Sequence, residues 1–228
     1  MEFKGHQKSS FIDYPDKIST VFFTGGCNFR CSYCHNSDLV YNKGEKITED
    51  FIFDYLEKRK KVLDAVCISG GEPTLHDGLY DFIEKVKTKG YLVKLDTNGT
   101  SPYTLNKLVA DELVDYVAMD IKAPIDKYNT VANADFAIER VIESIDILKN
   151  SYIDYEFRTT ICRELLTKED ILKIAEYLKG SRRYYLQNFR DGDTVLGGEN
   201  KFTPYSKKML IEIEKQIKNY FGVFKIRN

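Results

Sequence analysis

The chain has 228 residues, of which 43% are hydrophobic, and its 34 Lys and Arg nearly balance its 35 Asp and Glu. This balance gives no global basic field that would favour nucleic acid, and no apolar run reaches the roughly 18 residues that a membrane-spanning helix needs. Because residues 1–6 also lack an apolar signal region, we expect a soluble, cytoplasmic protein with no nucleic-acid or membrane partner.

The length fits one domain with a sizeable hydrophobic core. We expect a single domain over residues 1–228, with a core at about 18–190 and a C-terminal helix and strand at 204–226. There is no tandem repeat and no low-complexity segment that would indicate another organisation.

Apolar strands and amphipathic helices alternate along the chain. Pro15 and Asp16 predict a turn before a strand at 18–23, and Thr48 predicts the N-cap of a helix that ends near residue 60. Phe51, Ile52, Tyr55 and Leu56 are expected to share the apolar face of that helix. The pattern then predicts strands at 65–69, 92–95, 116–121, 153–160, 184–189 and 222–226, with helices at 78–89, 103–110, 136–148, 167–178 and 204–220.

This alternation predicts the fold class. Six strand–helix units in order favour a parallel sheet with helices outside it. Because a closed barrel needs eight such units, we expect an α/β fold with an open, partial (β/α)6 barrel.

Three of the five cysteines, Cys27, Cys31 and Cys34, form a CxxxCxxC motif directly after the first predicted strand. Such close spacing lets one loop wrap a single metal centre, and thiolates are the usual ligands of iron–sulfur clusters. No fourth cysteine lies nearby, so a cluster held here would keep one iron open. The alternative is a Cys3His zinc site closed by His35, but this residue directly follows Cys34 and would have difficulty turning onto the same metal.

The other two cysteines, Cys67 and Cys162, lie in apolar or β-branched runs. Free cysteine behaves as a small buried hydrophobe, so we expect a structural role for both.

Further polar motifs come directly after predicted strands. They are Gly70-Gly-Glu-Pro73, Asp96-Thr-Asn-Gly99 and Asp120-Ile-Lys122. In barrels of parallel strands the working residues gather at the C-terminal ends of the strands. Asp96 and Asp120 end neighbouring strands, where two inward carboxylates would repel each other unless a cation or a donor lay between them. The alternative is that the two carboxylates cap the helices that follow.

CxxxCxxC with an aromatic residue, Tyr33, before the last cysteine resembles the signature of the radical S-adenosylmethionine (SAM) family. Membership would imply a 4Fe-4S cluster on the three cysteines, with SAM chelated at the open iron and cleaved reductively to a 5′-deoxyadenosyl radical. The later motifs, including Met119-Asp-Ile-Lys122, are similar to those of glycyl-radical-enzyme activases.

This resemblance also implies partners. A glycyl radical enzyme would be the protein substrate, and a flavodoxin- or ferredoxin-like protein would donate the electron. The opening 7–15 and the short, cysteine-free segment 37–46 are most similar to activating proteins of anaerobic ribonucleoside-triphosphate reductase, ahead of pyruvate formate-lyase activases.

Site residues follow from the same resemblance. Gly70 and Gly71 would receive the methionine amino group of SAM, and Lys122 would contact SAM or substrate. A monovalent cation would bind Asp96, Thr97 and Asp120. The full set expected to bind cofactors is Tyr33, Gly70, Gly71, Glu72, Asp96, Thr97, Asn98, Asp120 and Lys122.

Other residues are left with open roles. Arg158 would either point inward and neutralise the SAM carboxylate or a substrate terminus, or face outward. Gln187 and Asn188 would reach the ribose or adenine of SAM. The loop 190–201 is a candidate lid or docking segment, with disorder as the alternative. His6 and His76 are expected to face solvent.

Two other classes of function remain open. One is a radical SAM enzyme acting on a small molecule, such as a deazapurine-forming synthase. The other is a non-enzymatic iron–sulfur electron carrier, which would need no SAM site.

Overall fold

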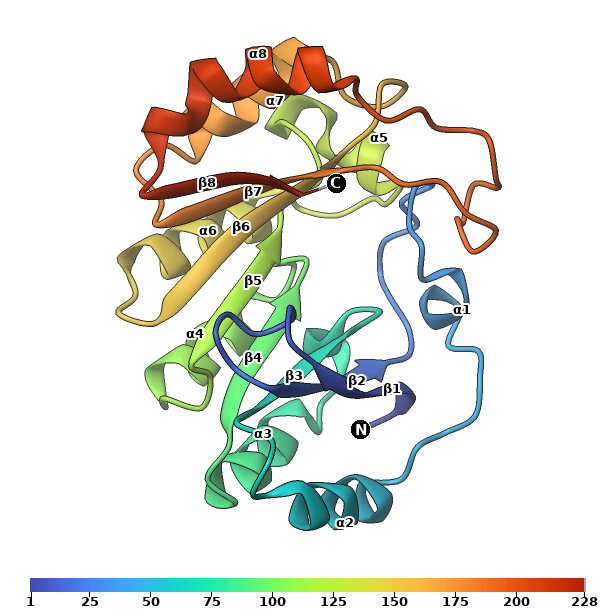
Figure 1. Ribbon diagram of the computed structural model, residues 1–228, viewed down its shortest axis with the longest axis vertical. Helices are drawn as coiled ribbons and strands as arrows, with labels where there is room; N and C mark the ends of the chain where they lie inside the picture. The colour runs from blue at the N-terminus through green and yellow to red at the C-terminus, as the bar shows by residue number, and fades with distance from the viewer. Residues whose placement is uncertain (228) are drawn as a thin grey trace. The chain divides into compact units, whose positions relative to one another are not determined.

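The computed structural model describes residues 1–227 and contains one eight-stranded sheet whose strands follow one another in chain order (Figure 1). The first pair of strands is antiparallel, and the pairs 2–3, 3–4, 6–7 and 7–8 are parallel. This mostly parallel, unclosed α/β sheet confirms the predicted fold class. The strands are β1 (Phe3–Ser10), β2 (Ser19–Thr24), β3 (Ala65–Gly70), β4 (Leu92–Thr97), β5 (Tyr116–Asp120), β6 (Asp154–Ile161), β7 (Arg183–Asn188) and β8 (Val223–Arg227).

The residues fall into two compact units, which are described separately. Unit 1 comprises residues 1–28, 38–118 and 140–154, and unit 2 comprises residues 29–37, 119–139 and 155–227. Boundaries between the two units fall within the short helix α1 (Ser37–Val40) and strand β5, and one residue inside helix α6 (Glu139–Asn150) and strand β6.

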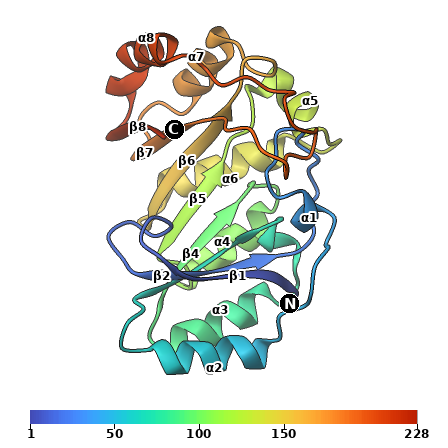
Figure 2. The same ribbon diagram turned by 45° about the vertical axis from the view of Figure 1, so that its right-hand side comes forward.

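Unit 1 holds four main helices, of which α2 and α3 lie side by side (Figures 1 and 2). The Thr48 hydroxyl accepts from the Phe51 N–H, so the predicted N-cap of α2 is confirmed. Ile52 and Leu56 of α2 are fully buried, but Phe51 is 49% exposed and does not share their face as predicted. The helices are α2 (Glu49–Arg59), α3 (Leu79–Thr88), α4 (Pro102–Ala110) and α6 (Glu139–Asn150), with a short 3-10 turn η1 (Pro73–Leu75).

Unit 2 carries β6–β8, and α7 and α8 lie side by side in both views (Figures 1 and 2). Thr167 and Asp170 form a reciprocal capping box that starts α7, at the position where the sequence predicts a helix over 167–178. The predicted helix at 204–220 begins later, after the N-cap Ser206. The elements are α5 (Tyr128–Ala132), α7 (Lys168–Tyr177) and α8 (Lys207–Ile217), with 3-10 turns η2 (Ile125–Lys127) and η3 (Lys218–Tyr220).

Strand β1 was not predicted. It pairs with β2 at the edge of the sheet, and Phe3 also forms an isolated antiparallel bridge with Ile47. Within β1 only Phe3 and Ser10 are buried, so the alternation that marks a strand is missing from its sequence. His6 of β1 stacks on Phe22 at a ring-centroid distance of 4.5 Å, and its Nε2 lies 2.9 Å from Thr20 Oγ1. His6 is therefore half-buried and packed against its neighbours, and no ligand role is indicated for it.

Cys67 and Cys162 are both 1% exposed, which confirms that they are buried. Burial raises the pKa of Cys67 to about 12 and that of Cys162 to about 11. Both thiols therefore stay protonated and unreactive at neutral pH.

Candidate functional site

The cysteine motif lies in the loop between β2 and α1, and residues 27–36 are called the cluster loop below. Cys27 belongs to unit 1, and Cys31 and Cys34 to unit 2. Within unit 2 the Cys34 N–H donates to the Cys31 carbonyl at 3.0 Å, which closes a turn between the two ligand candidates. Burial raises the pKa of the Cys31 thiol, which lies 3.7 Å from the Ala132 carbonyl oxygen.

No group of three or more His, Cys, Asp or Glu side chains within residues 1–227 is arranged to hold a metal ion. Two groups next to the cysteines nevertheless fit a cluster: the Asn36 N–H and the Tyr33 hydroxyl. The Asn36 N–H points at Cys34 Sγ at 3.4 Å, and such donation stabilises a ligating thiolate. The Tyr33 hydroxyl is buried without a hydrogen-bond partner among the described residues, as expected beside a group that the protein alone does not supply. These features fit a sulfur-ligated cluster.

His35, the ligand of the zinc alternative, stacks on Phe189 with ring centroids 5.3 Å apart and 30° between the ring planes. The ring therefore packs on an aromatic side chain, and this contact gives no support to a Cys3His site.

Gly70 and Gly71 are glycines because the backbone leaves no room for a side chain. A Cβ on Gly70, whose φ is +118°, would lie 2.4 Å from the Thr24 nitrogen. A Cβ on Gly71 would lie 1.9 Å from the Gly26 carbonyl oxygen, to which the Glu72 N–H donates at 2.8 Å. The structure therefore accounts for both glycines by close approach to the residues that precede the cluster loop. Their contact with SAM stays a prediction.

Gly71→Ala is expected to destabilise the metal-free protein by about 1–3 kcal/mol, the usual cost of an extra methyl in a packed position. The atom that it meets is backbone and has no free rotamer to retreat into. Urea unfolding measures the loss against Gly192→Ala, whose new Cβ meets nothing within 4 Å. Equal unfolding midpoints for the two variants would contradict the packing argument.

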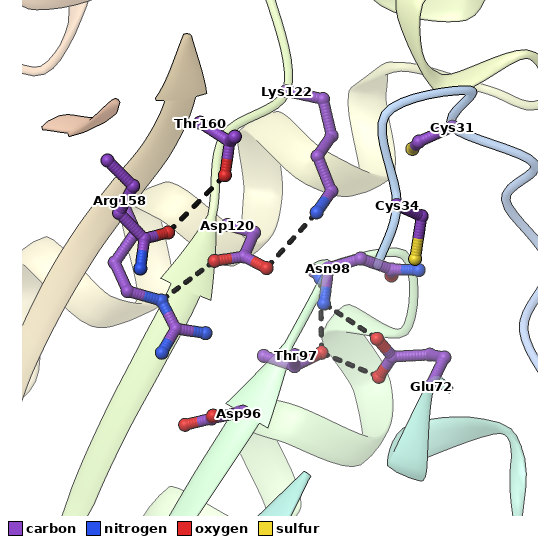
Figure 3. Close-up of polar contacts among 12 residues, drawn as sticks. Cys31, Cys34, Glu72, Asp96, Thr97, Asn98, Asp120, Lys122, Arg158 and Thr160 are labelled. Atoms are coloured by element: carbon purple, nitrogen blue, oxygen red, sulfur yellow. Dashed lines mark hydrogen bonds and ion pairs between the residues drawn. The ribbon is translucent and has the colours of Figure 1, made fainter. Parts of the chain in front are cut away.

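Glu72 is 1% exposed and joins two loops of unit 1 (Figure 3). Its Oε1 accepts from the Thr97 hydroxyl at 2.7 Å and from the Thr74 N–H at 3.1 Å, and its Oε2 accepts from the Asn98 N–H at 2.7 Å. Burial raises the pKa of Glu72 against these hydrogen bonds, which lower it. The carboxylate thus fixes the loop after β4 relative to the loop after β3, and its direct contact with SAM stays a prediction.

Glu72→Ala is expected to cost about 3 kcal/mol of unfolding free energy, because it leaves buried donors such as the Asn98 N–H without an acceptor. Glu72→Gln keeps the shape and an acceptor oxygen, so it is expected to lose less. Thermal unfolding of the metal-free variants tests this order, and an alanine variant as stable as wild type would rule out the bracing role.

Asp96 ends β4 with Thr97 and is paired inside unit 1. Its Oδ1 forms a short ion pair with Lys94, which is 3% exposed, and its Oδ2 accepts from the Ser69 hydroxyl at 3.0 Å. The ammonium of Lys94 also lies 5.8 Å from the centre of the Tyr116 ring.

Asp120 ends β5 and has two cationic partners in unit 2 (Figure 3). Arg158 Nε donates to Oδ1 at 2.8 Å and Lys122 Nζ to Oδ2 at 3.1 Å. Arg158 is only 13% exposed, so of the two orientations left open for it the inward one is observed. Two cations against one carboxylate leave this triad with a net positive charge.

Repulsion between Asp96 and Asp120 no longer argues for a monovalent cation between them. Asp96 and Asp120 each have a basic side chain of their own unit against the carboxylate, so no further charge is needed to relieve their repulsion. A cation on Asp96, Thr97 and Asp120 stays a prediction from resemblance.

Sequence reasoning missed Asn28, a spacer inside the cysteine motif. Its Oδ1 accepts from Asn98 Nδ2 at 2.8 Å, and its Nδ2 donates to the Thr100 hydroxyl at 2.9 Å. It also missed the contact of the half-buried His76, whose Nε2 lies 2.9 Å from the Gly25 carbonyl oxygen. An asparagine and a histidine in these positions have no periodicity that would have marked them.

At the end of β7, the Asn188 side chain forms two hydrogen bonds with the backbone of Tyr205. Its Nδ2 donates to the Tyr205 carbonyl at 3.1 Å and its Oδ1 accepts from the Tyr205 N–H at 2.9 Å. The Gln187 amide oxygen lies 3.4 Å from the Thr160 hydroxyl. Contacts of either residue with SAM stay predictions.

The radical SAM superfamily model matches residues 21–178 of this chain. The chain belongs to the radical SAM superfamily. Membership implies a 4Fe-4S cluster and SAM as cofactors and makes the chain an enzyme, as the cysteine motif predicts.

Curated relatives refine this membership. A Methanocaldococcus jannaschii protein, provisionally described as a glycyl-radical enzyme activating enzyme, is 35% identical over 96% of this chain and 92% of its own length. The pyruvate formate-lyase-activating enzyme of Streptococcus mutans is 31% identical over 74% of this chain and 68% of its own. The chain thus falls in the activating-enzyme family of radical SAM proteins.

Among solved structures, SuiB of Streptococcus suis bound to SAM superimposes with a TM-score of 0.70 and 13% identity, covering 91% of this chain and 49% of SuiB. This similarity supports the fold alone. No helix within residues 1–227 is both long enough and apolar enough to cross a membrane.

Proposed function

We propose that this chain activates a glycyl radical enzyme by abstracting a hydrogen atom from a glycine Cα, and that this partner is an anaerobic ribonucleoside-triphosphate reductase. The observation that carries the activating role is the 35% identity to the M. jannaschii relative over nearly the whole of both chains. The reductase is favoured by the opening 7–15 and by the short segment after the motif, which contains no further cysteine.

The residues of each unit have distinct tasks in this proposal. Cys27, Cys31 and Cys34 hold the cluster, which when bound supplies the electron for the reductive cleavage of SAM. In unit 2 the surplus positive charge of Arg158 and Lys122 over Asp120 suits a carboxylate ligand.

In unit 1, Gly70 and Gly71 bring the backbone close to the cofactor, while Glu72 holds Thr97 and Asn98 in place. These residues bind and orient, and the cofactors carry the hard chemistry. We infer a flavodoxin- or ferredoxin-like protein as the electron donor.

The deciding experiment incubates the anaerobically reconstituted protein with SAM, a reductant and the candidate partner, and follows the glycyl radical by electron paramagnetic resonance. A glycyl radical on the reductase, with methionine and 5′-deoxyadenosine formed, supports the proposal. A radical on pyruvate formate-lyase alone would overturn the choice of partner. SAM cleavage without any protein radical would instead favour a small-molecule substrate, and absence of SAM binding would favour an electron carrier.

A further inference from the structure

The loop after β7 contacts the cluster loop through the backbone. The Leu196 N–H donates to the Cys34 carbonyl at 2.8 Å, and the Gly197 N–H donates to the Ser32 carbonyl at 2.7 Å. All four residues belong to unit 2, and the orange-red segment runs beside the blue cluster loop in both views (Figures 1 and 2). We call residues 191–200 the strap.

Glycine is needed at position 197 because of this close contact, and not because of the backbone conformation there. A Cβ on Gly197 would lie 2.8 Å from the Ser32 carbonyl oxygen, whereas its φ lies outside the left-handed region that favours glycine. The neighbouring Gly192 has open space around the same position. The strap therefore approaches the cluster loop more closely than any other residue type would allow.

The strap is ordered by its own contacts. Asp191 joins its two ends, since Oδ1 accepts from the Gly192 N–H at 2.9 Å and Oδ2 accepts from the Asn200 N–H at 2.7 Å. In the middle, Val195 is 4% exposed, and its carbonyl accepts from the Gly198 N–H at 2.9 Å. The sequence alternative of a disordered loop is thus not what the structure contains.

The base of the strap is tied to the cluster loop by side chains as well. Phe189 packs against Phe202 with ring centroids 5.7 Å apart, and His35 of the cluster loop stacks on Phe189 at 5.3 Å. Both backbone and side-chain contacts therefore link the 32–35 segment to the strap and its flanking residues.

We propose that the strap is a positioning element for the cluster: through Leu196 and Gly197 it holds the turn that carries Cys31 and Cys34 and slows the loss of iron. A cluster held by three thiolates is released when the ligand loop opens. Opening this loop requires breaking the two backbone hydrogen bonds from Leu196 and Gly197, which an unattached loop would not have. This inference depends on the cluster and not on which enzyme the chain activates.

The test is the rate at which an iron chelator removes iron from the anaerobically reconstituted full chain. Gly197→Ala is expected to release iron about tenfold faster than wild type, the size expected when one or two hydrogen bonds are lost, while Gly192→Ala keeps the wild-type rate. Asp191→Ala, which loosens the strap without placing an atom against the cluster loop, is expected to release iron several-fold faster.

Thermal unfolding of the metal-free proteins separates this effect from general damage, because none of the three variants is expected to melt much below wild type. Equal release rates for Gly197→Ala and Gly192→Ala would overturn the proposal. So would a wild-type rate for Asp191→Ala, since the order of the strap would then not matter. Should Gly197→Ala fail to take up iron at all, the Asp191→Ala rate decides alone.

Discussion

Cys31→Ala is expected to abolish cluster binding and SAM cleavage completely, where the wild-type protein binds about four irons per chain after anaerobic reconstitution. Three thiolates leave one iron of a 4Fe-4S cluster open, and the other two cysteines, Cys67 and Cys162, are buried in strands or next to them, away from the motif along the chain. The same loss is expected for Cys27→Ala and Cys34→Ala. Iron content and SAM-derived 5′-deoxyadenosine are the two measurements.

Cys67→Ala is the matched control, because it also removes one thiol but from a side chain that is 1% exposed within the core. It is expected to keep the full iron content, with at most a modest loss of stability. If Cys67→Ala removed as much iron as Cys31→Ala, the choice of ligands would be wrong. Zinc in place of iron after strictly anaerobic purification would reject the cluster itself.

Asp120→Asn is expected to lower the unfolding free energy by about 3 kcal/mol at neutral pH, because it leaves Arg158 and Lys122 next to each other without their shared counter-charge. The control is Asp126→Asn, whose partner Lys173 is 59% exposed. Exposed pairs contribute less than about 1 kcal/mol, so this second variant should stay close to wild type. Denaturant unfolding of both variants makes the comparison.

The same residue makes a prediction about pH. Burial by itself raises the pKa of Asp120, but the charges of Arg158 and Lys122 outweigh it and hold the pKa well below its ordinary value. A carboxyl group with a depressed pKa in the folded state stabilises the fold above its unfolded pKa of about 3.9, and this contribution is lost as the pH falls further. Wild type should therefore lose stability below about pH 4 more steeply than Asp120→Asn. If the unfolding free energies of the two proteins fell equally with pH below about pH 4, the ionisation of Asp120 would not contribute to stability.

The sequence alone was sufficient for the alternation of main strands and helices from residue 18 onward, though not for β1, α1 and α5, and its motifs indicated the cofactors through the family resemblance. Helix starts such as Thr48 and Thr167 are local, because a hydroxyl needs only the N–H groups of the next turn. The motifs are local too: Gly70, Thr97 and Asp120 each end their strand, close to the predicted strand ends at 69, 95 and 121. Three thiols within eight residues indicate a metal centre wherever the loop lies.

Only the tertiary structure decided which groups these residues contact. The partner of Gly71 is the backbone of Gly26, and Cys34 receives its hydrogen bond from Leu196, some 160 residues further along the chain. Lys94 pairs with Asp96 two residues away on the same face of the strand, but only the structure shows that Lys94 is buried and needs this partner. Contacts between distant segments depend on how strands and loops pack in space, and no period or spacing in the chain encodes them.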